Sequence, residues 1–210
     1  MPQYSILIAC DQKYYNDWAE NLLKSIHYHC PKLKLRCHVV NHNKLIQLPY
    51  VKYTLETKTF KNDESRIAYL QAVRFLCASK IPAEEQFITL DADTICARPF
   101  SIDEFASIFS HQHVLKHHKA DRWLAGLVAF KSDDFRNVYA SRLLEEPVDD
   151  WLWGRDQDIL CDLADKYNYT PIDNKWIRIA KPKPDTVFLT LKGEQKVTEK
   201  YLVPFQGFIK

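Results

Sequence analysis

The sequence predicts an α/β fold in which a mixed, mostly parallel sheet is flanked by helices. Short apolar segments rich in β-branched residues alternate with longer segments whose apolar residues recur every three or four positions. The length of 210 residues suits one domain and can bury a core without disulfides or structural metals. A composition of 46% hydrophobic and 27% charged residues is that of a globular chain. Ligands of such sheets bind at the carboxyl ends of the strands, where site residues are therefore expected.

The first elements expected are a strand, a helix and two further strands. Residues 4–10 are apolar and β-rich, as in a buried strand. Asn16 can cap a helix over 16–29, in which apolar residues recur on one face. Residues 33–40 alternate between apolar and polar like a second strand, and 53–60 form a weaker third.

The middle of the chain continues the alternation. A helix that begins at Asp63 or Ser65 carries an apolar stripe and ends before Pro82, because proline cannot continue it. Residues 86–90 are expected to form a buried strand. The Ser-x-x-Glu pattern that opens 101–109 is a capping box for a short helix.

The second half is expected to be less regular. A buried strand over 125–130 is followed by helices over 132–145 and 155–166, and then by short strands, of which 186–191 is the clearest. Neither a repeat nor a domain boundary is visible, so residues 1–210 are treated as one domain.

The charge of the chain is unevenly distributed. The net charge is +2, but residues 175–210 hold eight Lys or Arg against three Asp or Glu, whereas the preceding part is slightly acidic. A basic segment from about Lys175 indicates contact with an anion, such as a diphosphate, a nucleic acid or a membrane surface. A solvated basic tail explains the same charge equally well.

Several classes of protein are disfavoured. No apolar run approaches the roughly 18–20 residues that span a bilayer, and the N-terminus lacks a secretory pattern, so a cytoplasmic protein without a transmembrane segment is expected. The six cysteines have no C-x-x-C spacing, which argues against a zinc or redox site. They are expected to be reduced and mostly buried.

Two carboxylates follow the strand expected at 86–90. If the backbone stays extended, Asp91 and Asp93 point the same way and form a hard oxygen site for Mg²⁺ or Mn²⁺. Such an ion bridges a nucleotide diphosphate and stabilises it as a leaving group. The alternative is a polar strand end that caps the following turn.

The segment 87–100, which contains both carboxylates, resembles the D-x-D segment of nucleotide-sugar glycosyltransferases with the GT-A fold. It is similar in particular to glycosyltransferase family 8, the galactosyltransferase and glycogenin family. The resemblance implies a Rossmann-like GT-A sheet and metal-dependent transfer of a hexose from a UDP-sugar to an acceptor hydroxyl, with retention of configuration. Further segments in the same order extend it over residues 4–196.

The segment 8–15 resembles the first strand and loop of that family, pattern A-x-D-x-x-Y. There Ala9, Asp11 and Tyr14 would hold the uridine, since a carboxylate accepts the imide N–H of uracil and an aromatic ring covers its face. The alternative is a turn that enters a helix, with a core tyrosine. Arg74, seventeen residues before the D-x-D motif, is similar to an arginine that reaches the donor. Its alternative is an ion pair with a surface carboxylate.

The segment 123–130 resembles the F-N-A-G-V segment of the family. Ala125 and Gly126 would let the donor sugar approach the backbone closely. Leu124 stands where the family has asparagine, so one hydrogen bond to the sugar is not expected here. The alternative is a buried strand with a glycine for packing.

The segment 154–160 resembles the D-Q-D segment of the family, which opens a helix beside the reacting carbon. The resemblance puts Asp156 on sugar hydroxyls and Gln157 on the face where a nucleophile would sit. Because an amide is a weak nucleophile, same-face attack with the leaving phosphate as base is expected rather than double displacement. The alternative is an acid-rich first turn favoured by the helix dipole.

The last motif of the family, H-x-x-G-x-x-K-P-W, is matched in part by 190–196. Gly193 and Lys196 keep the spacing, and Lys196 would contact phosphate. Thr190 stands at the position of the metal-binding histidine, and a hydroxyl is a poorer ligand. Two carboxylates, the diphosphate and water would then complete the metal site, or another residue substitutes.

Two further stretches have more than one interpretation. Residues 111–118 include four histidines and are expected to form a polar loop after a strand; a metal site and a loop over the acceptor are the alternatives. Trp151 and Trp153 either pack their own loop or stack on an acceptor sugar or base. The acceptor itself stays open among a glycan, lipopolysaccharide, a protein hydroxyl and a modified DNA base.

Two rival functions also fit part of the sequence. The run from Asp91 to Thr94 fits the D-x-D-x-T nucleophile motif of phosphatases or phosphotransferases of the haloacid dehalogenase type. That motif normally opens its fold, whereas here 90 residues precede it. The other rival is a non-enzymatic module that binds a nucleotide or a nucleic acid through the basic segment.

Overall fold

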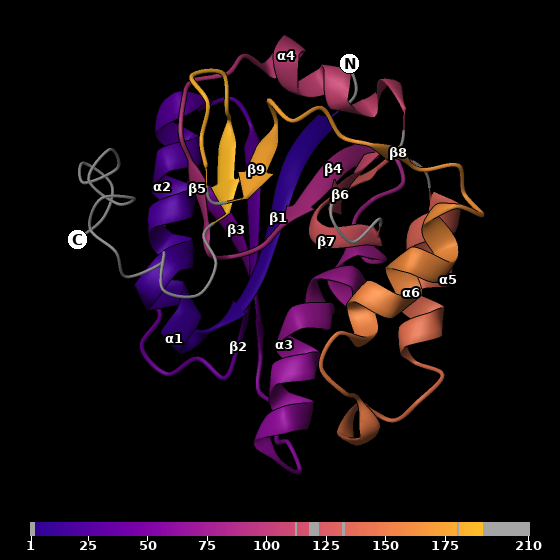
Figure 1. Ribbon diagram of the computed structural model, residues 1–210. Helices are drawn as coiled ribbons and strands as arrows, with labels where there is room; N and C mark the ends of the chain where they lie inside the picture. Colours follow the sequence, from indigo (N-terminus) through magenta and orange to yellow (C-terminus); the bar gives the residue numbers. More distant parts are fainter. Residues whose placement is uncertain (1–2, 112, 118–121, 132, 180, 191–210) are drawn as a thin grey trace.

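The computed structural model describes residues 3–111, 113–117, 122–131, 133–179 and 181–190. A seven-stranded mixed sheet with the order β3-β2-β1-β4-β7-β6-β8 forms the centre, and a three-stranded sheet with the order β5-β10-β9 accompanies it. Helices flank the large sheet on both faces (Figure 1). The predicted α/β fold with a mixed, mostly parallel sheet is therefore confirmed.

The parallel part of the large sheet comes from the first half of the chain. Its strands are β1 (Gln3–Asp11), β2 (Lys34–Val40), β3 (Val51–Glu56) and β4 (Glu85–Leu90). The other strands are β6 (His113–His117), β7 (Arg122–Phe130) and β8 (Thr170–Pro171). Strand β7 runs antiparallel to both β4 and β6. The carboxyl ends of β1 and β4 therefore lie at one edge, where β4 meets the middle of β7.

Helices cover both faces of this sheet. They are α1 (Gln12–Tyr14), α2 (Glu20–His29), α3 (Asp63–Ala78), α4 (Ile102–Ala106), α5 (Asp133–Leu143) and α6 (Arg155–Ala164). A π-helical turn (Tyr15–Ala19) joins α1 to α2, and 3₁₀ turns lie at Ser107–Ser110 and Val148–Asp150. In Figure 1, α2 and the small sheet lie on one side of the large sheet, and α3, α5 and α6 lie on the other.

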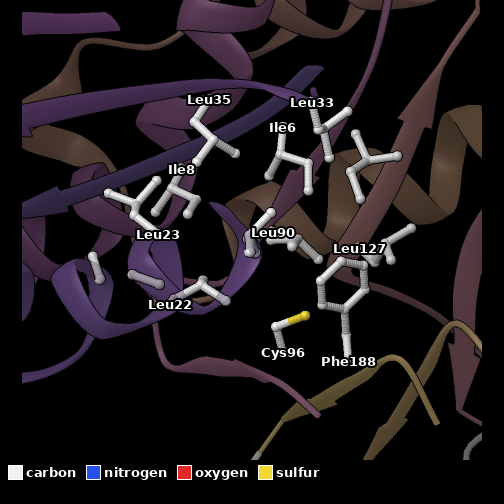
Figure 2. Close-up of a cluster of buried hydrophobic side chains, with 14 of the residues drawn as sticks. Ile6, Ile8, Leu22, Leu23, Leu33, Leu35, Leu90, Cys96, Leu127 and Phe188 are labelled. Carbon is white, nitrogen blue, oxygen red and sulfur yellow. The ribbon is translucent and has the colours of Figure 1, made fainter. Parts of the chain in front are cut away.

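Alternation along β1 divides the core into two clusters. Ile6 and Ile8 point to the side of α2 and the small sheet, where Figure 2 shows them together with Leu22, Leu23 and Phe188. Leu7 and Ala9, which alternate with them on β1, pack against α3 and its neighbours on the other side. Both faces of β1 are thus buried, which explains its continuous apolar sequence.

The small sheet brings a late part of the chain to the D-x-D motif. Its strands are β5 (Thr94–Cys96), β9 (Ile177–Ile179) and β10 (Phe188–Thr190). Strand β10 runs antiparallel to β5, so Thr190 lies opposite Thr94, the residue that follows the motif. The Thr190 hydroxyl is 3.4 Å from that of Thr94.

Two predicted elements differ from those observed. The helix expected from Asn16 begins at Gln12, because the Asp11 carboxylate caps it by accepting the Tyr14 N–H. The stretch 111–118, expected to be a polar loop, contains β6, so that prediction is wrong. Pairing with β7 gives these residues a strand conformation that their polar composition does not indicate.

Other differences are smaller. The third strand lies at Val51–Glu56 rather than at 53–60, and the helix expected over 101–109 is α4 followed by a 3₁₀ turn. The short strands expected after α6 are β8, β9 and β10, and β10 lies within 186–191. Strand β5 has no counterpart among the expected elements, because three residues are too few to show a period. All six cysteines are free and five are buried, as expected. No helix in the described part is long and apolar enough to cross a bilayer.

Candidate active site

Two cavities open at the edge where the parallel strands end. One, of about 520 Å³, adjoins the end of β1 and is called the Asp11 cavity. The other, of about 450 Å³, lies among α3, the end of β4, β7 and the start of α6, and is called the Arg74 cavity. Helix α3 lines both, with Arg66 and Leu70 at the first and Gln71 and Arg74 at the second.

The Asp11 cavity holds one of the three residues expected to bind the uridine. Asp11 accepts hydrogen bonds from the Tyr14 N–H (2.8 Å) and from Nη1 of Arg66 (3.3 Å). Ala9 is buried in the core, and the side chain of Tyr14 is exposed and does not line this cavity. The core tyrosine of this turn is the adjacent Tyr15, which is fully buried.

Arg66 was not predicted from the sequence. Its guanidinium lines the Asp11 cavity and forms ion pairs with Asp11 and Asp63. The signal available in the sequence was its spacing of two helical turns from Arg74, which by itself does not reveal which cavity α3 faces.

Arg74 is the centre of the second cavity. It is only 6% exposed, and its Nη1 lies 2.7 Å from Oδ1 of Asp91. Its Nη2 donates to the carbonyl of Ala125 (3.0 Å) and lies 3.5 Å from Oδ2 of Asp156. The alternative of an ion pair with a surface carboxylate is therefore wrong. Arg74, Asp91 and Asp156 are called the Arg74 cluster below.

Burial and charge act in opposite directions within the Arg74 cluster. Burial raises the pKa of the Asp156 carboxyl, and the Arg74 guanidinium only partly offsets that effect. Burial would lower the pKa of Arg74, but Asp91 and Asp156 outweigh it and raise the pKa above its usual value. Arg74 thus stays charged and offsets part of the cost of burying the Asp156 carboxylate.

Strand β7 is irregular where it lines the Arg74 cavity. Its register against β6 shifts, so that β7 has extra residues around Ala125 and Gly126. A side chain and a backbone group bond to this stretch: the Ala125 N–H donates to Oε1 of Gln157 (3.0 Å), and the backbone N–H of Asp91 donates to the carbonyl of Gly126 (3.1 Å). Nε2 of Gln157 donates to the carbonyl of Trp123. Gln157 therefore positions β7 with both ends of its amide.

The D-x-D segment is a turn and not extended backbone. Ala92 and Asp93 are turn residues, and the Thr94 N–H donates to the carbonyl of Asp91 (3.2 Å). The expectation that both carboxylates point the same way through strand alternation is therefore wrong. Asp91 lines the Arg74 cavity together with Thr190, whereas Asp93 is buried nearby, at 8% exposure.

The two tryptophans of the loop before α6 have different surroundings. Trp151 is 1% exposed, and its Nε1 donates to the carbonyl of Glu146 (3.0 Å), so it packs the loop. Trp153 is 71% exposed and lines the Arg74 cavity. Gly154, with a φ of +87°, then turns the chain into α6, where Asp156 and Gln157 occupy the first turn.

Two predicted phosphate contacts, Gly193 and Lys196, lie outside the described residues, as does the basic segment beyond Thr190. The remaining residues expected to bind the sugar and the metal, except Asp93, line the Arg74 cavity. Within the described part of the chain, no group of three or more His, Cys, Asp or Glu could hold a metal ion.

The fold is shared with solved glycosyltransferases. One is the galactosyltransferase LgtC, in complex with donor and acceptor sugar analogs. The match covers 97% of this chain and 93% of the LgtC chain, with a TM-score of 0.63 and 12% sequence identity. The glycosyltransferase GlyE of Streptococcus pneumoniae TIGR4 matches the whole chain, which spans 61% of GlyE, with a TM-score of 0.67 and 14% identity. No protein-family model and no curated protein matches the chain. At these identities the likeness establishes the fold, that of GT-A glycosyltransferases.

Proposed function

We propose that the protein is a metal-dependent glycosyltransferase, similar to glycosyltransferase family 8, that moves a hexose from a UDP-sugar to an acceptor hydroxyl with retention. The observation that carries this function is the Arg74 cluster. One buried arginine joins Asp91 of the D-x-D motif to Asp156 of the D-Q-D segment and bonds to the backbone of Ala125. Four segments that resemble the family, distant in sequence, thus meet at one point.

A nucleotide sugar would extend across both cavities. Arg66 and Arg74 lie eight residues apart on α3, which is about 12 Å along the helix axis. The base would occupy the Asp11 cavity, with Asp11 accepting its imide N–H. The hexose would occupy the Arg74 cavity, with Asp156 on its hydroxyls and the irregular part of β7 close to its ring.

Asp91 and Asp93 would hold Mn²⁺ or Mg²⁺, since carboxylate oxygens suit both ions. Two carboxylates are an incomplete ligand set, so the diphosphate of the donor and water would supply the rest. The ion supplies positive charge that stabilises the departing diphosphate. Lys196 of the basic segment is proposed as a contact to the same phosphates.

Gln157 would act by positioning and not as a nucleophile. Both polar atoms of its side chain bond to β7, and an amide is a weak nucleophile. The acceptor hydroxyl would attack from the face that the diphosphate leaves, and the leaving phosphate would take its proton. Arg74 and Asp156 would hold the sugar during that step.

Gln157→Ala is expected to slow transfer by roughly 100-fold, because Ala125 loses its anchor and a misplacement of about 1 Å has that effect. Since the base lies in the other cavity, the Kd for UDP should stay within about threefold of the wild-type value, a change of less than 1 kcal/mol. Isothermal titration and single-turnover kinetics measure the two quantities. Gln47→Ala, at an exposed glutamine outside both cavities, is the control and should leave both quantities unchanged. A collapse of UDP affinity with a normal rate per bound donor would contradict this role.

The rival functions fit the geometry less well. The phosphatase motif normally opens its fold, whereas Asp91 follows β4, the fourth strand along this chain. Neither a phosphatase nor a basic binding module explains why Asp156 and Ala125 share the same arginine.

The experiment that tests the proposed function is the binding and hydrolysis of nucleotide sugars. UDP should bind only weakly without Mn²⁺ and at least tenfold more tightly with it, because the diphosphate and the ion complete one site. A set of UDP-sugars should include one that is hydrolysed in a metal-dependent way. Absence of metal-dependent UDP binding would reject the proposed glycosyl transfer. UDP binding with a steep salt dependence and no hydrolysis would favour a basic binding module instead.

Thr190→His is expected to tighten Mn²⁺ binding to the nucleotide-free protein at least tenfold. Thr190 lines the Arg74 cavity beside the D-x-D turn, and imidazole is a better ligand than a hydroxyl. Titration with MnCl₂ measures the change, and Thr190→Val, which has no ligand atom, is the control. Micromolar Mn²⁺ binding by the wild-type protein would contradict the incomplete ligand set.

A further inference from the structure

The Arg74 cavity has a buried end and an exposed end. Arg74 and Asp156, which would hold the donor sugar, are both buried. At the exposed end lie Trp153, 71% exposed, and Arg122, which is exposed as well. Both residues line the cavity, but the proposed binding of the donor uses neither Trp153 nor Arg122.

The local structure fixes the direction of Arg122. It is the first residue of β7, and side chains alternate along a strand. The next residue, Trp123, is buried on the other face, where its Nε1 donates to Oδ1 of Asp165 (3.1 Å). Arg122 therefore shares the face of Leu124, which also lines the cavity.

Charge distinguishes Arg122 from the other arginine of the cavity. Arg74 is neutralised by Asp91 and Asp156. Within the described part of the chain, the Arg122 guanidinium has no hydrogen-bond or ion-pair partner. An unpaired guanidinium beside an exposed indole is suited to a ligand with an anionic group and an apolar face, because guanidinium binds carboxylate or phosphate bidentately.

We propose that the acceptor is an acidic sugar, a glycosyl unit that carries a carboxylate or a phosphate. This inference rests on the proposed glycosyl transfer. The indole of Trp153 stacks on the apolar face of the acceptor ring, and Arg122 binds its anion. A neutral sugar would leave Arg122 without a partner, and an acceptor without a ring would leave the indole uncovered.

The test uses three small acceptor probes that differ at one carbon: methyl glucoside, methyl glucuronide and methyl glucoside 6-phosphate. Binding to the full chain, with UDP and Mn²⁺ present and absent, is measured by ligand-observed NMR titration. At least one acidic probe should bind about tenfold more tightly than methyl glucoside, as a charge-assisted hydrogen bond predicts. The carboxylate and phosphate arms show which anion is preferred.

The variants assign that preference to the two residues. Arg122→Gln should abolish it, and Trp153→Ala should weaken all three probes together. Arg142→Gln, which removes an exposed arginine of α5 that does not line the cavity, should preserve it. The inference would be overturned by equal binding of the three probes, by no binding of either acidic probe, or by an unchanged preference in Arg122→Gln.

Weaker UDP binding by Arg122→Gln would also overturn the inference, because it would assign Arg122 to the donor. Failure of the proposed function is a separate result, since it appears as a lack of metal-dependent UDP binding and hydrolysis whatever the probes do.

Discussion

Arg74→Met should abolish glycosyl transfer and lower the free energy of unfolding by about 3–5 kcal/mol, the usual cost of breaking a buried ion pair. Methionine fills much of the same volume but leaves Asp91 and Asp156 without their shared cation. Urea unfolding and a coupled assay of UDP release measure the two effects.

The loss of stability caused by Arg74→Met should shrink as the pH is lowered, because the pKa of Asp156 is already raised by burial and rises further without Arg74. A carboxyl with a raised pKa in the folded state costs stability above its unfolded pKa, and that cost disappears in acid.

Two companion variants separate the structural role of Arg74 from its role in transfer. Arg142→Met removes an exposed arginine whose ion pairs measure 3.6 and 3.7 Å, and should cost less than about 1 kcal/mol. Adding Asp91→Asn and Asp156→Asn to Arg74→Met removes the buried charges and should recover stability but no activity. Wild-type transfer by Arg74→Met, or a stability loss no larger than that of Arg142→Met, would show that the cluster is not the centre of the site.

The parts of the fold that the sequence predicts are those whose local pattern and tertiary surroundings agree. The strands expected at 86–90 and 125–130 are continuous apolar runs because both faces of the central sheet are covered. Strand β6, with the sequence His-Val-Leu-Lys-His, has no such pattern and owes its conformation to pairing with β7. Boundaries near Asn16 shifted because Asp11 is itself a helix cap.

The same distinction holds for the candidate site. Asp91 and Asp156 belong to short motifs and Arg74 has the spacing of the resemblance from the first of them, and all three line one cavity. Arg66 and Arg122 belong to no motif, and their positions follow only from which way α3 and β7 face. The turn at the D-x-D segment was missed because local sequence does not show that the chain leaves β4 for the small sheet at that residue.

Asp93→Asn should remove metal-dependent UDP binding and reduce transfer by at least about 100-fold, the effect of losing one group that stabilises developing charge. From the sequence, substitutions of Asp91 and Asp93 are both expected to spare the fold. Both carboxylates act on the buried Arg74, because Asp91 is ion-paired with it and Asp93 contributes to its raised pKa. Asp91→Asn, which breaks the 2.7 Å ion pair, should lower stability, and the urea midpoint of each variant shows how much of its effect comes from the fold.

The measurement for Asp93→Asn is the Kd for UDP with and without Mn²⁺, together with the rate of donor hydrolysis and the urea midpoint. Asp162→Asn is the matched control, because it removes the charge of an exposed carboxylate on α6. It should leave the Kd values, the rate of hydrolysis and the urea midpoint unchanged. If Asp93→Asn kept metal-dependent UDP binding while Asp91→Asn lost it, one carboxylate would suffice. Asp91 and Asp93 are the only carboxylates proposed to hold the metal ion. If the Asp91→Asn, Asp93→Asn double variant turned over the donor at the wild-type rate, no metal ion would act at the D-x-D turn, and the turn would be a structural cap of β4.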